Sequence, residues 1–159
     1  HGFASARKLK EGELVVVDFG AVYNGYRSDI TRTYIVVGEK GPRGQRRRRR
    51  KARLIGIVRA AQRKAIKAVK SGVRACDVDK VARDYLIKQG FGKQFIHSTG
   101  HGVGKRVHQA PKIGPRNKNR LKVGQVVCIE PGVYFKGYGG VRWEDMFVVT
   151  KKGCWALTK

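Results

Sequence analysis

The sequence predicts an α+β fold, in which two helices pack on a largely antiparallel sheet. Residues 54–69 and 77–89 carry apolar side chains at helical spacing. Short apolar runs of strand length lie before and after these segments, and the tetrapeptide YNGY at 23–26 has the composition of a hairpin turn. Because 159 residues are enough to bury one core, we expect residues 1–159 to form a single domain.

The first part of the chain is expected to form a hairpin, a linker and a helix, in that order. Residues 14–20 predict a buried strand, and residues 30–37 predict the strand that returns beside it. Residues 38–44 and the basic run at 46–51 predict a polar linker. The apolar periodicity then predicts the first helix over 54–69.

The second helix is predicted over 77–89, with Asp77 as its N-cap and Gly90 as the residue that ends it. The rest of the chain has the pattern of strands and loops. Strands are expected at residues 95–99, 125–129, 141–150 and 154–157.

Composition narrows the class of protein. Lys and Arg number 36 against 11 Asp and Glu, so the formal net charge is +25. No run of about 18 apolar residues is present, so we expect no membrane-spanning helix. Cys76, Cys128 and Cys154 lie too far apart for a CxxC motif or a disulfide framework, which favours a reducing, cytosolic compartment.

The few carboxylates indicate where chemistry could occur. The helix at 77–89 accounts for three of them, Asp77, Asp79 and Asp84, which receive no functional role. Four others, Asp18, Asp29, Glu130 and Glu144, lie within or beside apolar, strand-like runs. A carboxylate in such surroundings is costly unless it is paired or bound to a metal.

Three of the four histidines lie within the glycine-rich stretch HSTGHGVGKRVH at 97–108. Glycines on both sides of His101 allow the backbone to bend closely around it. The candidate site therefore comprises Asp18, Asp29, His101, Glu130 and Glu144. Four like charges would repel one another without cations, and this oxygen-rich donor set suits Mn, Fe(II), Co or Zn.

Three motifs, VVVDFGAVYNGYRSDITRTY, HSTGHGVGKRVHQAP and IEPGVY followed by GGVRWEDM, resemble those of the pita-bread metallopeptidases. The resemblance runs in order over nearly the whole chain and implies helices packed on a curved sheet. It also implies two divalent metal ions, with Mn favoured over Co, Zn or Fe. In that reading Asp29 and Glu144 bridge the ions, Asp18 binds one, and His101 and Glu130 bind the other.

Within this family, GGVRWED and EPGVY resemble the Xaa-Pro aminopeptidases and prolidases. The resemblance implies hydrolysis of Xaa-Pro bonds at peptide N-termini by a hydroxide that bridges the metals. The expected partner is a peptide with proline in second position. A methionine aminopeptidase is an alternative within the family.

The resemblance also assigns roles beside the metals. Glu130 would shuttle the proton, and His108 would bind the substrate and the tetrahedral intermediate. His97 resembles a pocket histidine near the prolyl residue, and His1 another substrate-side histidine. Arg142 resembles an arginine that lies next to the bridging carboxylates.

The catalytic domain of this family is larger than 159 residues, so we expect this chain to lack the N-terminal part of that domain.

The charge of the chain leaves another function open. The +25 charge and the run RRRRRK at 46–51 fit a non-catalytic relative that binds nucleic acid, another polyanion or protein. Whether the chain forms a homodimer stays open.

Overall fold

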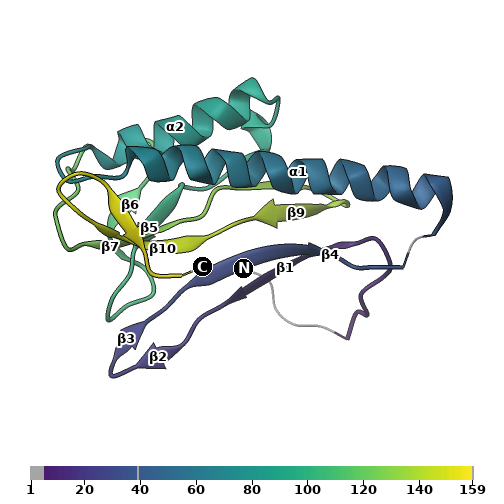
Figure 1. Cartoon of the computed structure of the whole chain (residues 1–159), viewed down its shortest axis with the longest axis horizontal. Helices are drawn as coiled ribbons and strands as arrows, with labels where there is room; N and C mark the ends of the chain where they lie inside the picture. The colour runs from purple at the N-terminus through teal and green to yellow at the C-terminus, as the bar shows by residue number, and fades with distance from the viewer. Residues whose placement is uncertain (1–5, 39, 159) are drawn as a thin grey trace.

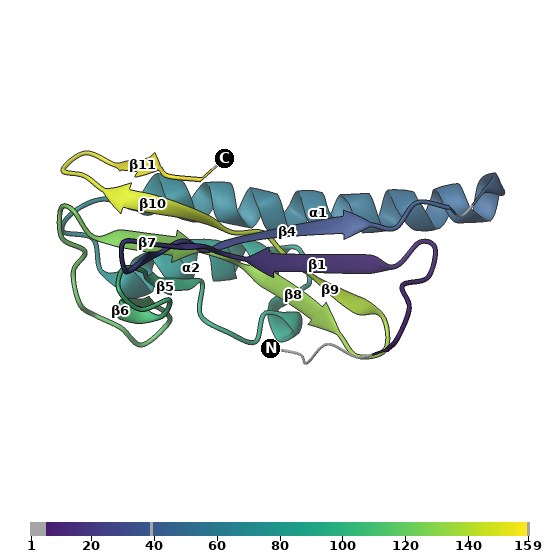
Figure 2. The same cartoon turned by 90° about the horizontal axis from the view of Figure 1, so that it is seen from below.

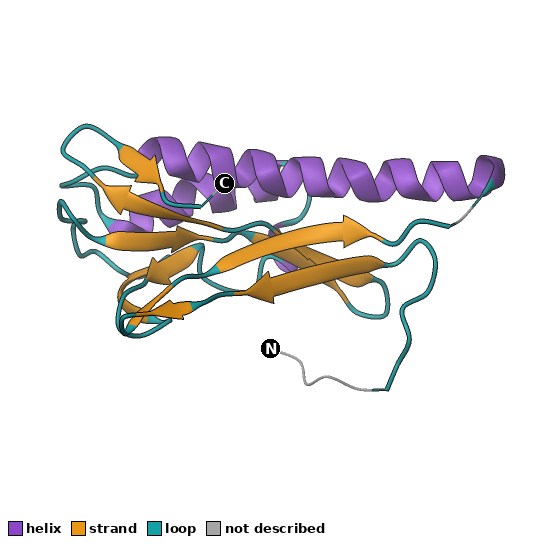
Figure 3. Cartoon of the chain, turned by 60° about the horizontal axis from the view of Figure 1, so that its bottom comes forward, coloured by secondary structure: helices purple, strands orange, loops and turns teal. Residues whose placement is uncertain are grey.

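The computed structural model describes residues 6–38 and 40–158. Two helices cover one side of a set of antiparallel strands, as Figure 1 shows. The same two layers are seen in Figure 3, where the helices lie on one side and the strands on the other. The prediction of an α+β fold is therefore confirmed.

The N-terminal hairpin pairs β1 (Leu14–Phe19) with β4 (Ile30–Ile35), and the register places Asp18 opposite Thr31. Between them lies a smaller ladder of β2 (Val22–Tyr23) and β3 (Tyr26–Arg27). Its turn has positive φ at both central residues, 47° at Asn24 and 78° at Gly25. That conformation suits an Asn-Gly hairpin turn, so the predicted hairpin and its turn are confirmed. The prediction that the first strand is buried is wrong, because the second half of β1, Val17 to Phe19, is exposed.

Helix α1 (Gly41–Ala68) is longer than predicted, because it begins at Gly41 and not near Leu54. The expected polar linker at 46–51 is helical. Apolar periodicity begins only at Leu54, where the helix reaches the core, so this signal could not mark the true start. Arginine has a high helix propensity, and Pro42 lies in the first turn, where proline is tolerated.

Helix α2 (Ala75–Lys88) begins two residues before the predicted start, so Asp77 is not its N-cap. Arg74 is the N-cap residue, and its guanidinium forms an ion pair with Asp77, with both N···O distances at 2.8 Å. The predicted stop is confirmed. Gly90 has a φ of 84°, and its N–H donates to the carbonyl of Ile87 at 2.9 Å.

A five-stranded sheet in the order β11-β10-β7-β5-β6 carries much of the site. Its bounds are β5 (Gly100–Gly102), β6 (Gln109–Ile113), β7 (Val126–Ile129), β10 (Asp145–Val149) and β11 (Cys154–Ala156). A separate pair joins β8 (Gly132–Phe135) and β9 (Gly139–Arg142). Figure 2 shows these strands from the side away from the helices.

Two predicted strands are wrong in detail. The segment 95–99 is not a strand: a 3-10 turn (Gly92–Gln94) precedes it, and the strand forms instead at Gly100–Gly102. The segment 141–150 is two strands in different sheets, since β9 ends at Arg142 and β10 begins at Asp145. At the break, Glu144 forms an isolated bridge with Thr31 of β4, which ties the hairpin to the larger sheet.

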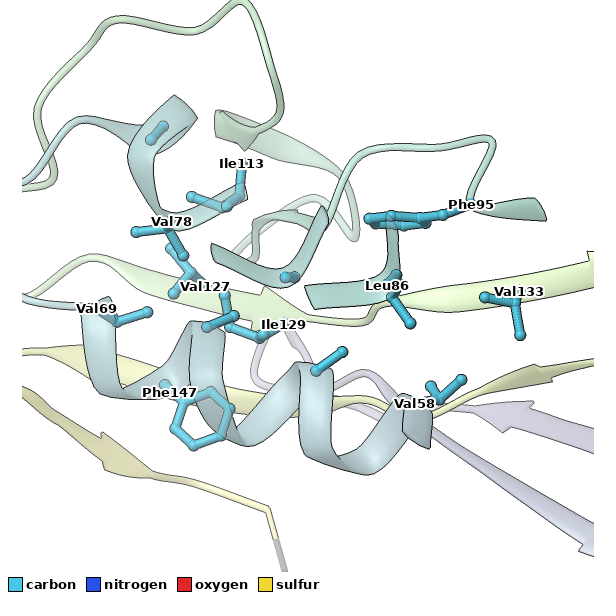
Figure 4. Packing of buried hydrophobic residues seen from close by; sticks show 14 of the residues in the cluster. Val58, Val69, Val78, Leu86, Phe95, Ile113, Val127, Ile129, Val133 and Phe147 are labelled. Atoms are coloured by element: carbon cyan, nitrogen blue, oxygen red, sulfur yellow. The ribbon is translucent and has the colours of Figure 1, made fainter. Parts of the chain in front are cut away.

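The core lies between the helices and the strands. Figure 4 shows Val58 of α1, Val69 just after α1 and Leu86 of α2 in one cluster with Val127 and Ile129 of β7. Neither helix within 6–38 and 40–158 is long and apolar enough to cross a bilayer.

Candidate metal centre

A cavity of about 690 Å³ opens beside the hairpin and the five-stranded sheet. Every candidate site residue within the described part of the chain lines it. These are Asp18, Asp29, His97, His101, His108, Glu130, Arg142 and Glu144. The remaining candidate, His1, lies outside the described residues. The fold thus brings together side chains that are as much as 126 positions apart in the sequence.

His101 is at the centre of this group. It lies opposite Cys128 of the neighbouring strand β7. Because β5 pairs with β6 on one side and β7 on the other, the position of the His101 backbone is fixed by both strands. Its Nδ1–H donates to the carbonyl of Gly102 at 3.1 Å, which leaves Nε2 with a free lone pair. That Nε2 lies 3.5 Å from Oε1 of Glu130 and 3.7 Å from Oδ2 of Asp29.

Glu144 is 2% exposed, and only one of its carboxylate oxygens has a protein partner in the described structure. Oε2 accepts a hydrogen bond from the hydroxyl of Thr31 at 2.7 Å, whereas Oε1 accepts none. Burial, with the nearby charge of Asp29, raises the pKa of Glu144 to about 7. Burial, with the charge of Glu144, raises the pKa of Glu130 to about 8.

These groups fit a divalent cation. The lone pair of His101 Nε2 faces carboxylate oxygens of Asp29 and Glu130, and Oε1 of Glu144 is a buried oxygen without a hydrogen-bond partner among the described residues. Each of these atoms is a good ligand for Mn, Fe, Co or Zn. Cations at this point would satisfy Glu144 Oε1 and favour the ionised carboxylates.

Cys128 was not predicted to lie here. Ligand atoms of Asp29, His101, Cys128 and Glu144 all lie within 4.8 Å of one another. The backbone N–H of Asp29 also donates to Sδ of Met146, at 3.1 Å. Two sulfur atoms therefore lie beside an otherwise oxygen-rich group. Their position depends on the register of β5, β7 and β10, which local sequence patterns do not reveal.

Asp18 lines the same cavity but is not one of these four clustered residues. Its carboxylate forms an ion pair with Nη2 of Arg142 at 2.5 Å. Arg142 therefore contacts Asp18, which the resemblance assigns to one ion, and forms no ion pair with Asp29 or Glu144, the expected bridging carboxylates, among the described contacts. Nε of the same guanidinium lies 3.9 Å from Oε2 of Glu130.

Tyr134 of β8, which is not among the predicted site residues, links Arg142 to His97. Its hydroxyl accepts from Nη1 of Arg142 at 2.9 Å and lies 3.0 Å from Nε2 of His97. Because Nδ1–H of His97 donates to the carbonyl of Ser98, Nε2 accepts from the tyrosine hydroxyl. Burial lowers the pKa of His97, in keeping with this neutral form. A side chain at Gly132 would clash with this pair.

Asp79 was also missed, since it was assigned to the helix with Asp77 and Asp84. It is 1% exposed and forms a bidentate ion pair with Arg83, at 2.8 and 2.9 Å. Arg83 in turn donates to the carbonyls of Phe95 and His97. The pair thus holds the segment that leads from α2 to His101. The i, i+4 spacing of Asp79 and Arg83 in the sequence indicates an ion pair, but nothing in the sequence indicates that the pair is buried.

His108 lies beside His101, with 4.2 Å between the ring centroids. It comes from the loop between β5 and β6 and faces the same cavity. His97 and His108 both line the cavity with His101, so the three histidines of the glycine-rich stretch all reach the site.

Comparison with known proteins gives a consistent result. The profile of metallopeptidase family M24 matches residues 1–151. A Xaa-Pro dipeptidase of Pyrococcus furiosus is 44% identical over 159 residues, which is all of this chain and 43% of that enzyme. The chain therefore spans less than half the length of this relative.

Solved structures extend the comparison. An X-Pro aminopeptidase from Thermotoga maritima superposes with a TM-score of 0.90 at 38% identity, over all of this chain and 42% of that one. A methionine aminopeptidase from Rickettsia prowazekii superposes with a TM-score of 0.80 at 25% identity, over all of this chain and 69% of that one.

Proposed function

The chain belongs to metallopeptidase family M24 and has its pita-bread fold, and from this premise we propose that it contains the centre of a dinuclear metallopeptidase that hydrolyses Xaa-Pro bonds. The expected substrates are peptides with proline in second position. The Xaa-Pro names of its relatives support this substrate class. The GGVRWED motif that ends in Glu144 and Asp145 supports it as well.

One observation carries the proposal: the lone pair of His101 Nε2 faces carboxylate oxygens of Asp29 and Glu130 in a cavity that Glu144 also lines. We propose that two divalent cations, Mn in the first place, are held there by Asp18, Asp29, His101, Glu130 and Glu144. Such cations supply a nucleophile at neutral pH by lowering the pKa of water, and they polarise the scissile carbonyl.

The chain's own residues supply the rest of the chemistry. Glu130 lines the cavity 3.5 Å from Nε2 of His101, so in the ionised form that cations favour its carboxylate can accept a proton and return it. His108 lies beside His101 at the cavity wall and can donate a hydrogen bond to the substrate. His97, held by Tyr134, lines the cavity and is proposed to contact the prolyl residue.

Arg142 is proposed to position rather than to react. It holds Asp18 and the hydroxyl of Tyr134 at the same time, so one guanidinium couples a predicted metal ligand to the histidine pocket. The three free thiols, at Cys76, Cys128 and Cys154, support the further proposal of a reducing, cytosolic compartment.

The test combines metal content with activity on the same sample. Protein loaded with Mn should contain two ions per chain by elemental analysis and should cleave Ala-Pro or Ala-Pro-Ala. Asp29→Ala should lower both the metal content and the cleavage, whereas Asp84→Ala, on the exposed side of α2, should change neither.

The outcomes separate the alternatives. Cleavage of Met-Ala-Ser but not Ala-Pro-Ala would show a methionine-type enzyme. Two bound metals without cleavage of either peptide would show a metal site that needs residues outside this chain. A metal content unaffected by Asp29→Ala would refute the proposed ligand set.

A further inference from the structure

The first turns of α1 form a concentrated basic surface, which we call the arginine segment (residues 41–53). It contains eight basic residues and no acidic one: Arg43, Arg46, Arg47, Arg48, Arg49, Arg50, Lys51 and Arg53. Figure 2 shows this end of α1 extending past the ends of the strands. The peptidase proposal gives this segment no role.

The positive charges lie on most sides of the helix, and only the face of Gly44, Arg48 and Lys51 is turned toward the chain's own hairpin. Successive residues of an α-helix are about 100° apart, so five consecutive arginines at 46–50 cover the full circumference. All of residues 45–50 are exposed. Lys51 is less exposed, since its amine donates to the carbonyl of Gly12 and lies 5.2 Å from the ring centroid of Tyr138.

The helix contains no acidic residue to offset this charge. Its first turn has no acidic residue, and the sequence has none from Lys40 to Cys76. Like charges at i, i+3 and i, i+4 destabilise a helix, and basic side chains near its N-terminus destabilise it further. The segment therefore has a cost in folding stability that an anionic partner would relieve.

The shape of the charge distribution identifies the partner class. A helix on a membrane surface needs an apolar face, and the arginine segment has no large apolar side chain. A flat acidic protein surface would contact only one side of the helix. The DNA major groove is about 12 Å wide, accepts a helix of about 10–12 Å, and has phosphates on both sides. We infer that the arginine segment binds duplex DNA through its phosphates, without sequence preference.

This inference is tested on the whole chain with two charge-matched variants. The first changes Arg46, Arg48, Arg49 and Arg50 to Gln, which keeps a high helix propensity. The second changes exposed lysines in loops at the other end of the molecule, where Figure 1 places the loops that flank β7 and join β10 to β11: Lys118, Lys122, Lys151 and Lys152 to Gln. Each variant removes four positive charges, and circular dichroism confirms that each is folded.

Binding is measured by fluorescence anisotropy with a short DNA duplex over a range of salt concentrations. The arginine variant should bind more than about ten-fold more weakly at 0.1 M salt, and its slope of log affinity against log salt should be shallower by about 3 to 4. The lysine variant should lose less than about three-fold, because its charges do not contact the duplex.

Three results would overturn the inference. Equal losses in the two variants would show that net charge, and not this helix, attracts DNA. Tighter binding to single-stranded RNA, to anionic vesicles or to polyglutamate at the same salt would assign the segment to another class of partner. If the unaltered chain does not bind duplex DNA in a salt-dependent way, the inference has no basis.

Discussion

Asp79 of α2 accepts hydrogen bonds from both the backbone N–H and the hydroxyl of Thr99, at 3.0 and 2.9 Å. Thr99 lies two positions before His101, and the N–H of Glu130 donates to its carbonyl at 2.7 Å. A buried carboxylate on a helix thus organises the backbone next to two proposed metal ligands. The helix layer and the candidate site are joined at this point.

Two ion pairs on α2 have the same i, i+4 spacing, but the buried pair, Asp79–Arg83, should contribute far more to folding stability than the exposed pair, Lys80–Asp84. Asp79→Asn should lower the free energy of unfolding by about 3 kcal/mol or more, because it leaves the partly buried Arg83 without its anion. Asp84→Asn removes the i, i+4 partner of Lys80 on the same helix, but there both side chains are more than half exposed. It should cost less than about 1 kcal/mol.

Urea denaturation of the two variants measures this difference. Equal effects would mean that burial does not distinguish the two pairs. In the same Asp79→Asn protein, amide exchange at Thr99 and Glu130 should be faster, because the hydrogen bonds around Thr99 are weakened.

Two glycines should respond in opposite directions to replacement by alanine. A Cβ at Gly100 would lie 1.9 Å from the carbonyl oxygen of Cys128, so Gly100→Ala should separate β5 from β7 and destabilise the chain strongly. A Cβ at Gly56, within α1, meets nothing within 4 Å. Gly56→Ala should therefore raise the free energy of unfolding by about 0.5–1 kcal/mol. Thermal denaturation of both variants checks the prediction, and a neutral Gly100→Ala would contradict the close approach of the two strands.

The buried carboxyls predict a pH dependence of the metal-free protein. Burial raises the pKa of Glu144 from 4.5 to about 7 and that of Glu130 to about 8. The folded state therefore retains protons that the unfolded state releases. This contribution to stability is complete below about pH 4.5 and is lost as the pH rises through 7 to 8.

His97 and His101 act in the opposite direction, because burial lowers their pKa values. The measurement is therefore a difference: the free energy of unfolding of the wild type minus that of Glu144→Gln, with a chelator present. This difference should fall as the pH rises from 5 to 8, since the amide that replaces the Glu144 carboxyl cannot ionise. With Mn added, the same difference in free energy of unfolding should rise with pH, because a cation binds the ionised carboxylate of Glu144. A flat difference without metal would contradict the raised pKa of Glu144.

The three thiols should differ in reactivity. Cys128 lies on the central strand β7 and is 0% exposed, whereas Cys76 and Cys154 are partly exposed. A maleimide should modify Cys76 and Cys154 in the folded protein, and Cys128 only after unfolding. Mass spectrometry of the labelled peptides gives the order. Labelling of Cys128 in folded protein would show that β7 is not the buried centre of the sheet.

Local patterns were sufficient for much of the fold. The Asn-Gly turn, both helices and the end of α2 at Gly90 could be predicted, because turn conformation and helical periodicity depend on neighbouring residues. The start of α1 could not, because its first turns have no apolar face from which a period could be read. The break between β9 and β10 was not predicted either, because the chain passes from one sheet to the other there without a change in composition.

By itself, the sequence determined which side chains could form a site, because carboxylates in apolar runs and histidines among glycines are costly or unusual without a function. Only the tertiary structure decided which of them meet. It placed Asp29, Glu130 and Glu144 around His101, joined Asp18 to Arg142, and added Cys128, Tyr134 and Asp79. The physical reason is that these contacts depend on strand register and on the packing of α2, which join residues far apart in the chain.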